Sequence, residues 1–216
     1  MMFNPALLTT KMLEICEVGR FLFEKGWCSA TSGNFSCRLN NELIAITVSG
    51  HPKGELTQED VIVVNMMSNP LESTKKPSNE TPLHLLLYQM DDNIEAVLHT
   101  HSVNATVLSR LYAPQQKLKL ENYEMLKAFH GTTTHETQEI VPIFPNTQDI
   151  PSLAKQVKTY LAQYPATHGY LVASHGLYTW GTSLAEDRRH VEAFEFLFEC
   201  EILALRLGTA ISPTAT

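Results

Sequence analysis

Two apolar runs in this chain have the length and composition of buried β-strands, and each is followed by histidine. His99 and His101 come at the end of the run 94–98, and His175 follows the run 170–174. Because alternate side chains of a strand share a face, we expect the imidazoles of His99 and His101 to point the same way. An α/β architecture gathers functional groups at strand ends, so we expect His175 to join them.

These histidines predict a catalytic metal site. Three neutral imidazole nitrogens with one open position are typical of catalytic zinc, whereas structural zinc usually has four protein ligands, often cysteines. The histidines alone do not exclude another divalent metal. The alternative is that they are ordinary strand-end histidines bonded to backbone, and an isolated His-x-His would favour that interpretation. The second apolar run ending in histidine favours the metal.

The composition is that of one globular domain. We expect a single domain over residues 1–216, with a frayed tail at about 209–216. The net charge of −7 and the lack of clustered Lys and Arg argue against nucleic acid as a partner. No signal peptide or run of membrane-spanning length is present, which predicts a cytoplasmic protein with no membrane partner. The four cysteines have no Cys-x-x-Cys spacing, so reduced thiols are expected.

Hydrophobic periodicity, caps and turn residues predict a mixture of helices and strands. Hairpin strands mixed with helices favour an α/β fold whose sheet is at least partly antiparallel and covered by helices, rather than a doubly wound parallel sheet. The expected elements are a helix over 8–22 ending at Gly26, strands 34–39 and 43–48 joined by Asn40-Asn41, a strand 61–65, a helix beginning near Pro82 with Ser78 or Asn79 as its cap, helices 104–111 and about 123–129, a strand 140–144, a helix 151–164, and a last helix from a capping box of Ser183 and Glu186 to Gly208.

Three segments rich in Ser, Gly and Asn have the composition of anion-binding loops. They span 31–34, 47–50 with Lys53, and 77–80. Small residues let backbone N–H groups approach a phosphate, and a helix after Ser78 would offer the positive end of its dipole. Taken singly, each segment is an ordinary turn, and a surface lysine is usually only solvated. Three together favour a phosphate site, whose candidate residues are Ser32, Gly33, Asn34, Ser49, Gly50, Lys53 and Ser78.

These loops, together with His99-Thr100-His101 and Ser174-His175-Gly176, resemble the class II aldolase and adducin family over nearly the whole chain. The resemblance implies a three-layer α/β/α sandwich around a predominantly antiparallel central sheet. It also implies a homotetramer with sites near subunit interfaces. The implied substrate is a small sugar phosphate bound through a divalent metal, and the implied metal is zinc, with one ion per subunit held by His99, His101 and His175.

Within this family, segments 98–102, 122–128 and 142–147 resemble its dehydratases. That resemblance implies loss of water from a methylthio-substituted ketose phosphate. It also implies that Glu124 is an acid/base, a role that needs a carboxyl pKa raised toward neutrality. The alternative is a solvated Glu124 that pairs with Lys127 or Lys119.

Glu80 is the last residue of the third loop, at a position where the resemblance implies glutamate in aldolases and cysteine in some dehydratases. Glu80 is therefore a fourth zinc ligand, a second proton carrier, or only a carboxylate favoured by the helix dipole. The remaining histidines lack paired spacing and are interpreted as surface or hydrogen-bonded side chains. They include His84, His130, His135, His168 and His190.

Two other functions remain open at the level of sequence. A sugar-phosphate aldolase or epimerase would use the same metal-stabilised enediolate, and neither fold nor metal separates these outcomes from dehydration. A non-catalytic adducin-like assembly module would keep the fold without needing the metal ligands.

Overall fold

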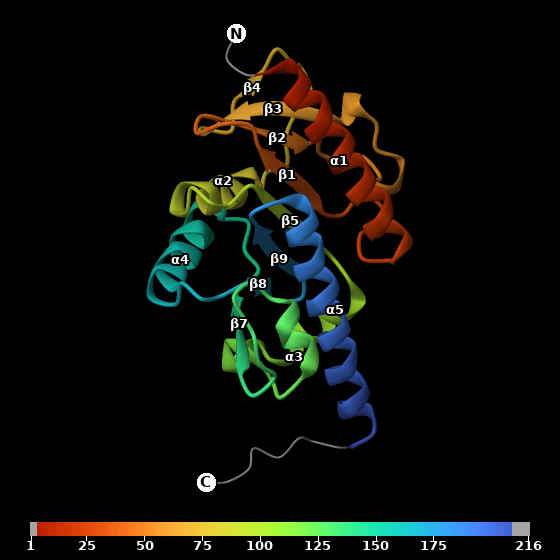
Figure 1. The fold of residues 1–216 in the computed structure, drawn as a ribbon, viewed down its shortest axis with the longest axis vertical. Helices are drawn as coiled ribbons and strands as arrows, with labels where there is room; N and C mark the ends of the chain where they lie inside the picture. Colours follow the sequence, from red (N-terminus) through yellow and green to blue (C-terminus); the bar gives the residue numbers. More distant parts are fainter. Residues whose placement is uncertain (1–3, 209–216) are drawn as a thin grey trace.

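The computed structural model describes residues 4–208, and within them a nine-stranded sheet lies between two layers of helices (Figure 1). The strand order is β4-β3-β2-β1-β5-β9-β8-β7-β6. All neighbouring strands are antiparallel except β7 and β8, which are parallel. The strands are β1 (Asn34–Arg38), β2 (Leu43–Thr47), β3 (Val61–Asn65), β4 (Pro70–Leu71), β5 (Ala96–Thr100), β6 (Lys117–Glu121), β7 (Gln138–Phe144), β8 (Gly169–Val172) and β9 (Gly176–Gly181).

The helices cover both faces of this sheet, as the alternation of side chains in β2 shows. Ile44 and Ile46 pack in one core with α2 and α4, whereas Leu43 and Ala45 pack in a second core with α1. A third core lies under α3 and α5. The helices are α1 (Pro5–Glu24), α2 (Thr81–Met90), α3 (Val103–Leu111), α4 (Ile150–Gln163) and α5 (Leu184–Arg206), with 3₁₀ turns η1 (Lys53–Glu55), η2 (Gln58–Asp60), η3 (Ala113–Gln115) and η4 (Glu124–Ala128). The expected three-layer sandwich around a predominantly antiparallel sheet is confirmed.

Several local predictions were wrong. β4, β6 and β9 were not expected, and the helix predicted near 123–129 is the short 3₁₀ turn η4. Helix α2 begins at Thr81, so Glu80 rather than Ser78 or Asn79 occupies the cap position, and Glu80 makes no capping bond. The expected tail at 209–216 lies outside the described residues.

The capping box expected at the start of α5 forms only in part. The Ser183 hydroxyl accepts the backbone N–H of Glu186 at 3.1 Å, as predicted. The Glu186 carboxylate instead accepts the N–H of Thr182 at 2.7 Å and the hydroxyl of the same residue. Glu186 therefore ties the turn before α5 to the first turn of the helix.

The pairing of β5 with β9, in the middle of the sheet, brings two distant parts of the chain together at the same end of these strands. His99 is paired with Tyr178, and Thr100 with Leu177. Because the strands are antiparallel, the end of β5 lies beside the start of β9. A Cβ atom on Gly176 would collide with the carbonyl oxygen of Thr100, so the close approach of the strands requires glycine there.

His168, just before β8, is held by acceptors at both ring nitrogens. Its Nδ1 lies 3.0 Å from Glu139 Oε2, and its Nε2 lies 2.9 Å from the carbonyl oxygen of His130. Both partners accept, so both contacts are satisfied only when both ring nitrogens carry a proton, which is the imidazolium form. Burial lowers the pKa of His168, but the hydrogen bond and charge of Glu139 outweigh it and raise the pKa above 6.5.

We expect this pair to make stability depend on pH. A pKa raised in the folded state stabilises the protein fully below the unfolded value of about 6.5, and the contribution is lost as pH rises through the raised pKa. His168→Gln should therefore lower the unfolding temperature most at pH values below 6.5. Glu139→Gln should flatten the same pH profile. Thermal unfolding between pH 5 and 9 measures it, and a pH-independent difference between wild type and His168→Gln would contradict it.

Candidate metal centre

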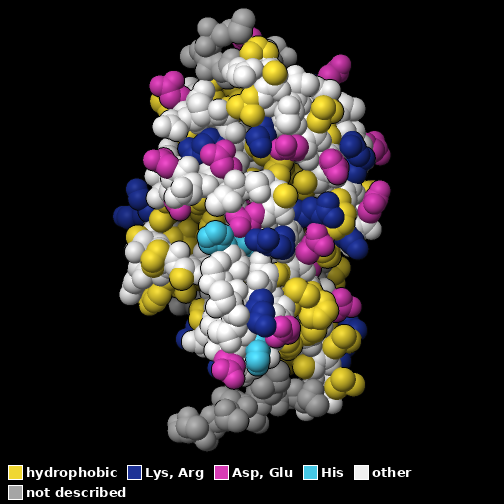
Figure 2. Space-filling view, in the orientation of Figure 1, with side chains coloured by type: hydrophobic (Ala, Val, Ile, Leu, Met, Phe, Trp, Pro, Cys, Tyr) yellow, Lys and Arg dark blue, Asp and Glu magenta, His cyan; other side chains and the backbone are white. Residues whose placement is uncertain are grey.

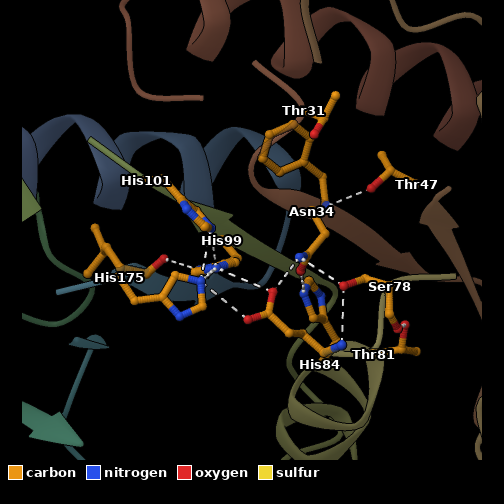
Figure 3. Close-up of polar contacts among 12 residues, drawn as sticks. Thr31, Asn34, Thr47, Ser78, Thr81, His84, His99, His101 and His175 are labelled. Atoms are coloured by element: carbon orange, nitrogen blue, oxygen red, sulfur yellow. Dashed lines mark hydrogen bonds and ion pairs between the residues drawn. The ribbon is translucent and has the colours of Figure 1, made fainter. Parts of the chain in front are cut away.

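Four side chains converge where the end of β5 meets the start of β9: Glu80, His99, His101 and His175 (Figure 3). The Nε2 atom of His101 lies 2.8 Å from that of His99 and 3.2 Å from that of His175. The Nε2 atoms of His99 and His175 are 3.3 Å apart. Glu80 approaches both, with Oε2 3.5 Å from His99 Nε2 and Oε1 3.4 Å from His175 Nε2. One ligand atom from each residue lies within 4.8 Å of the others.

The four members come from three places in the fold. His99 lies within β5, and its ring stacks on Tyr178 of β9 with centroids 3.8 Å apart. His101 follows the end of β5, where its backbone N–H donates to the Trp27 carbonyl at 2.8 Å. His175 lies in the turn between β8 and β9, and Glu80 stands directly before α2. The group therefore exists only when the central sheet and α2 are assembled.

His99 presents an unprotonated nitrogen to the other two histidines. His99 Nδ1 donates to the Leu177 carbonyl at 2.9 Å, which leaves a lone pair on Nε2. Burial, followed by the neighbouring His101 and His175, lowers the pKa of His99 well below 6.5. Burial, then His175 and Lys53, lowers the pKa of His101 to about 4. These two imidazoles are therefore neutral at physiological pH, which is the form that binds a metal.

This donor set fits a divalent cation. Nitrogen lone pairs this close together repel unless a proton or a cation lies between them. In a tetrahedral zinc site with bonds of about 2.0–2.1 Å, adjacent donor atoms are about 3.3 Å apart. The contacts among the four residues range from 2.8 to 3.5 Å, close to that separation. Three imidazole nitrogens with one carboxylate are a ligand set that such ions accept.

Two of the predicted phosphate loops lie directly against this group. Asn34 Nδ2 donates to Glu80 Oε2 at 2.9 Å and to Ser78 Oγ at 3.4 Å. Gly33, with a φ of +81°, lies so close to β5 that a Cβ would be 2.7 Å from the His99 carbonyl oxygen. Segment 31–34 therefore contacts segment 77–80 through the carboxylate of Glu80.

The second loop joins the others through backbone and lysine contacts. The N–H of Ser49 donates to the Lys76 carbonyl at 3.0 Å, while Ser49 and Gly50 are exposed. Lys53 is only 1% exposed, so the alternative of a solvated surface lysine is wrong. Its ammonium donates to the carbonyls of His51 and Thr31 at 2.6 and 3.1 Å, and burial lowers its pKa. Within the described residues, the buried hydroxyl of Ser32 has no hydrogen-bond partner.

Glu124 does not join the metal group within this chain. Its side chain is 72% exposed and pairs with Lys127 at 2.6 Å and with His135 at 3.4 Å. The hydrogen bond from Lys127 lowers the pKa of Glu124, opposite to the shift expected of an acid/base. In the isolated chain, Glu124 therefore has the environment of the alternative, a solvated residue paired with Lys127.

One residue that the sequence interpretation treated as ordinary belongs to this neighbourhood. His84 is fully buried on α2, with Nδ1 2.7 Å from Ser36 Oγ and Nε2 hydrogen-bonded to Asn34 Oδ1. Its position four residues after Glu80 was the available signal, because residues spaced by four share a helix face. His130, His168 and His190 make other hydrogen bonds, as expected.

The fold and the histidine–glutamate group define the class of protein. This chain belongs to the class II aldolase and adducin family: the family model described as the Class II Aldolase and Adducin N-terminal domain matches residues 13–202. Among solved structures, an L-fuculose 1-phosphate aldolase superposes with a TM-score of 0.76 at 26% identity, covering 92% of this chain and 88% of its own. That of Thermus thermophilus gives 0.73 at 25% identity, covering 94% and 97%.

Curated relatives are more similar still. The methylthioribulose-1-phosphate dehydratase of Marinobacter nauticus is 51% identical over 206 residues, covering 95% of this chain and 99% of its own. That of Pseudomonas aeruginosa is 54% identical over 195 residues, covering 90% and 95%. The resemblance to dehydratases within the family is confirmed. In the described part of the chain, no helix combines the length and apolarity needed to span a bilayer.

Proposed function

We propose that this chain is a zinc-dependent methylthioribulose-1-phosphate dehydratase. It removes water from 5-methylthioribulose 1-phosphate to give 2,3-diketo-5-methylthiopentyl 1-phosphate, a step of methionine salvage. The observation that carries the proposal is identity above half with such dehydratases over nearly the full length of both chains. The convergence of Glu80 and three histidines supports it, because this chemistry needs an electrophile beside the substrate ketone.

In this proposal the zinc ligands are His99, His101 and His175, with Glu80 in the same group. A bound zinc ion would polarise the ketone oxygen and so acidify the proton at C3. Glu80 is held by Asn34 and lies on the side of the site formed by α2, where it is available either as a ligand or as a carrier of that proton. Loss of the C4 hydroxyl and tautomerisation of the enol give the diketone.

The phosphate is proposed to lie against the three joined loops. Their candidate contacts are the residues predicted from the sequence: Ser32, Gly33, Asn34, Ser49, Gly50, Lys53 and Ser78. The unpaired hydroxyl of Ser32 supports this assignment, because it is a donor available to a ligand. The buried ammonium of Lys53 also supports it. Its two hydrogen bonds go to neutral backbone carbonyls, so its positive charge is available to attract an anion.

Glu124 is proposed as the acid that protonates the departing C4 hydroxyl, acting at the site of a neighbouring copy in a homotetramer. Its exposure, and the fact that it is not among the four residues of the metal group in its own chain, support this arrangement. Burial against another copy would raise its pKa, because desolvation disfavours the carboxylate. A mixed pattern of charges with hydrophobic patches covers the face in Figure 2, and exposed apolar residues on α3 and α5 supply contact area. These are Val103, Val107, Leu111, Phe196, Leu203 and Leu205.

A substrate assay on the purified protein tests the proposal. Incubation with 5-methylthioribulose 1-phosphate should give the ultraviolet absorbance of a diketone, and treatment with a chelator should abolish it until zinc is restored. Metal analysis should find about one zinc per chain. Absence of both diketone and bound metal would contradict the proposal. The cytoplasmic location stays a prediction from the sequence.

A sugar-phosphate aldolase is the second candidate, favoured by a specific observation. Glu80 stands within contact distance of the metal-binding histidines, the position that the resemblance assigns to aldolases, and L-fuculose 1-phosphate aldolases share the fold. The same incubation separates the two reactions, since aldol cleavage yields an aldehyde and a shorter phosphorylated fragment. A non-catalytic assembly module is disfavoured by the intact metal-binding group.

A further inference from the structure

A line of hydrogen bonds runs from the interior of the protein to the metal group (Figure 3 shows its outer part). The Tyr88 hydroxyl lies 2.8 Å from Ser36 Oγ, which lies 2.7 Å from His84 Nδ1. His84 Nε2 is bonded to Asn34 Oδ1, and Asn34 Nδ2 donates to Glu80 Oε2 at 2.9 Å. The first four of these residues are buried, so the line is shielded from water.

The chemistry of the groups fixes the direction of every bond. An amide oxygen only accepts, so His84 Nε2 must donate to Asn34 Oδ1. Burial lowers the pKa of His84 to about 3, so the ring is neutral and its Nδ1 must accept. The hydroxyl of Ser36 therefore donates to His84, and that of Tyr88 donates to Ser36. Every donor in the line then has an acceptor, and no alternative assignment satisfies all of them.

This order leaves Asn34 a single orientation. With its amide turned over, Oδ1 would face the Glu80 carboxylate and the NH₂ group would face the N–H of His84. Both contacts would be repulsive in a buried site, where an unsatisfied polar group costs about 1–3 kcal/mol. The tautomer of His84 thus decides which end of the Asn34 amide meets Glu80.

We propose that His84 is a positioning residue for the metal centre: by donating from Nε2 to Asn34, it directs the Asn34 amide to Glu80 and holds that carboxylate beside the three histidines. The inference rests on the proposed metal centre. Groups that orient metal ligands in this way are usually worth a 10- to 100-fold change in metal affinity.

Two substitutions at His84 separate hydrogen bonding from shape. His84→Phe keeps a ring but cannot donate to Asn34, and we expect zinc affinity to fall by about 10-fold or more. His84→Gln offers both an N–H donor and an acceptor, so its affinity should return close to the wild-type value. Competition with a chromophoric chelator measures both. Equal affinity for His84→Phe and wild type, or equal losses in both variants, would overturn the inference.

A matched control lies at the inner end of the same line. Tyr88→Phe removes one hydroxyl but leaves the Ser36 hydroxyl to donate to His84, so zinc affinity should stay close to that of wild type. His99→Ala serves as the reference for the metal centre itself. If wild type and His99→Ala bind zinc equally, the metal centre is wrong. If His99→Ala loses zinc while His84→Phe keeps it, only the role of His84 is wrong.

The tautomer can also be read directly in wild-type protein. Nitrogen-15 NMR of the imidazole rings distinguishes a proton on Nε2 from one on Nδ1. We expect His84 to carry its proton on Nε2 throughout the pH range in which the protein is folded. A proton on Nδ1 would overturn the inference, even if His84→Phe failed to fold.

Discussion

Replacing His99 with alanine is expected to abolish zinc binding and turnover together. The substitution removes the ligand in the middle of the group, whose Nε2 lies within 3.5 Å of His101, His175 and Glu80. It also removes the ring that stacks on Tyr178. Since the loss of groups that merely orient ligands costs 10- to 100-fold in affinity, the loss of a ligand should cost more than about 100-fold. Metal analysis after dialysis and the diketone assay measure the two effects.

His130→Ala is the control for this experiment. His130 is an exposed histidine paired with Glu186, away from the four residues of the metal group. This variant should keep both zinc and activity, which would show that losing an imidazole outside the metal group has no effect on either. Full zinc occupancy in His99→Ala would remove His99 from the metal site.

Glu124→Gln is expected to keep zinc but lose most of its turnover. Glutamine is nearly isosteric with glutamate but cannot supply a proton, and acid–base catalysis typically contributes about 10²- to 10⁴-fold to rate. The metal group contains no atom of Glu124, so zinc content should be unchanged. The loss should appear in kcat. Glu136→Gln, at an exposed carboxylate nearby in the sequence, is the matched control and should behave as wild type.

Mixing two inactive variants tests where Glu124 acts. If it serves the metal centre of a neighbouring copy, mixed oligomers of Glu124→Gln and His99→Ala contain sites with an intact Glu124 and intact ligands. Such mixtures, unfolded and refolded together, should recover activity that neither variant shows alone. Activity absent from the mixture, with oligomers formed, would place Glu124 outside the neighbouring site. Full activity in Glu124→Gln would remove it from the mechanism.

The metal histidines could be found from the sequence because their signal is local. A strand alternates its side chains, so one residue between His99 and His101 is enough to bring their rings together. Predicting that His175 joins them required a second inference, that another strand ends beside the end of β5. The antiparallel sheet followed from the hairpin of β1 and β2, whose turn at Asn40 and Asn41 is short.

The missing elements depend on tertiary contacts. Three of the five residues of β6 are charged. The strand lies at the edge of the sheet, where pairing with β7 rather than intrinsic propensity keeps it extended. β9 is bounded by Gly176 and Gly181, which read as turn residues. Both glycines are instead required by close packing, against Thr100 and Asp187.

Buried polar partners were the hardest part of the site to predict. His84 looks like any isolated histidine, because its contacts with Ser36 and Asn34 of β1 have no sequence signature. Lys53 looks like a solvated lysine for the same reason, since its acceptors are backbone carbonyls that have no sequence signature. The surroundings of Glu124 were predicted only as the alternative, a solvated residue paired with Lys127, because nothing in the local sequence separates such a pair from an acid/base.

The antiparallel pairing of β5 with β9 also bears on when the proposed metal ion could be bound. His101 and His175 are separated by 74 residues along the chain. A newly synthesised chain that has made β5 carries Glu80, His99 and His101 but still lacks His175, so one imidazole of the group is missing. The third imidazole, that of His175, reaches the group only after β8 and β9 have paired in the central sheet. Tight metal binding would therefore follow formation of the sheet and would mark a late stage of folding.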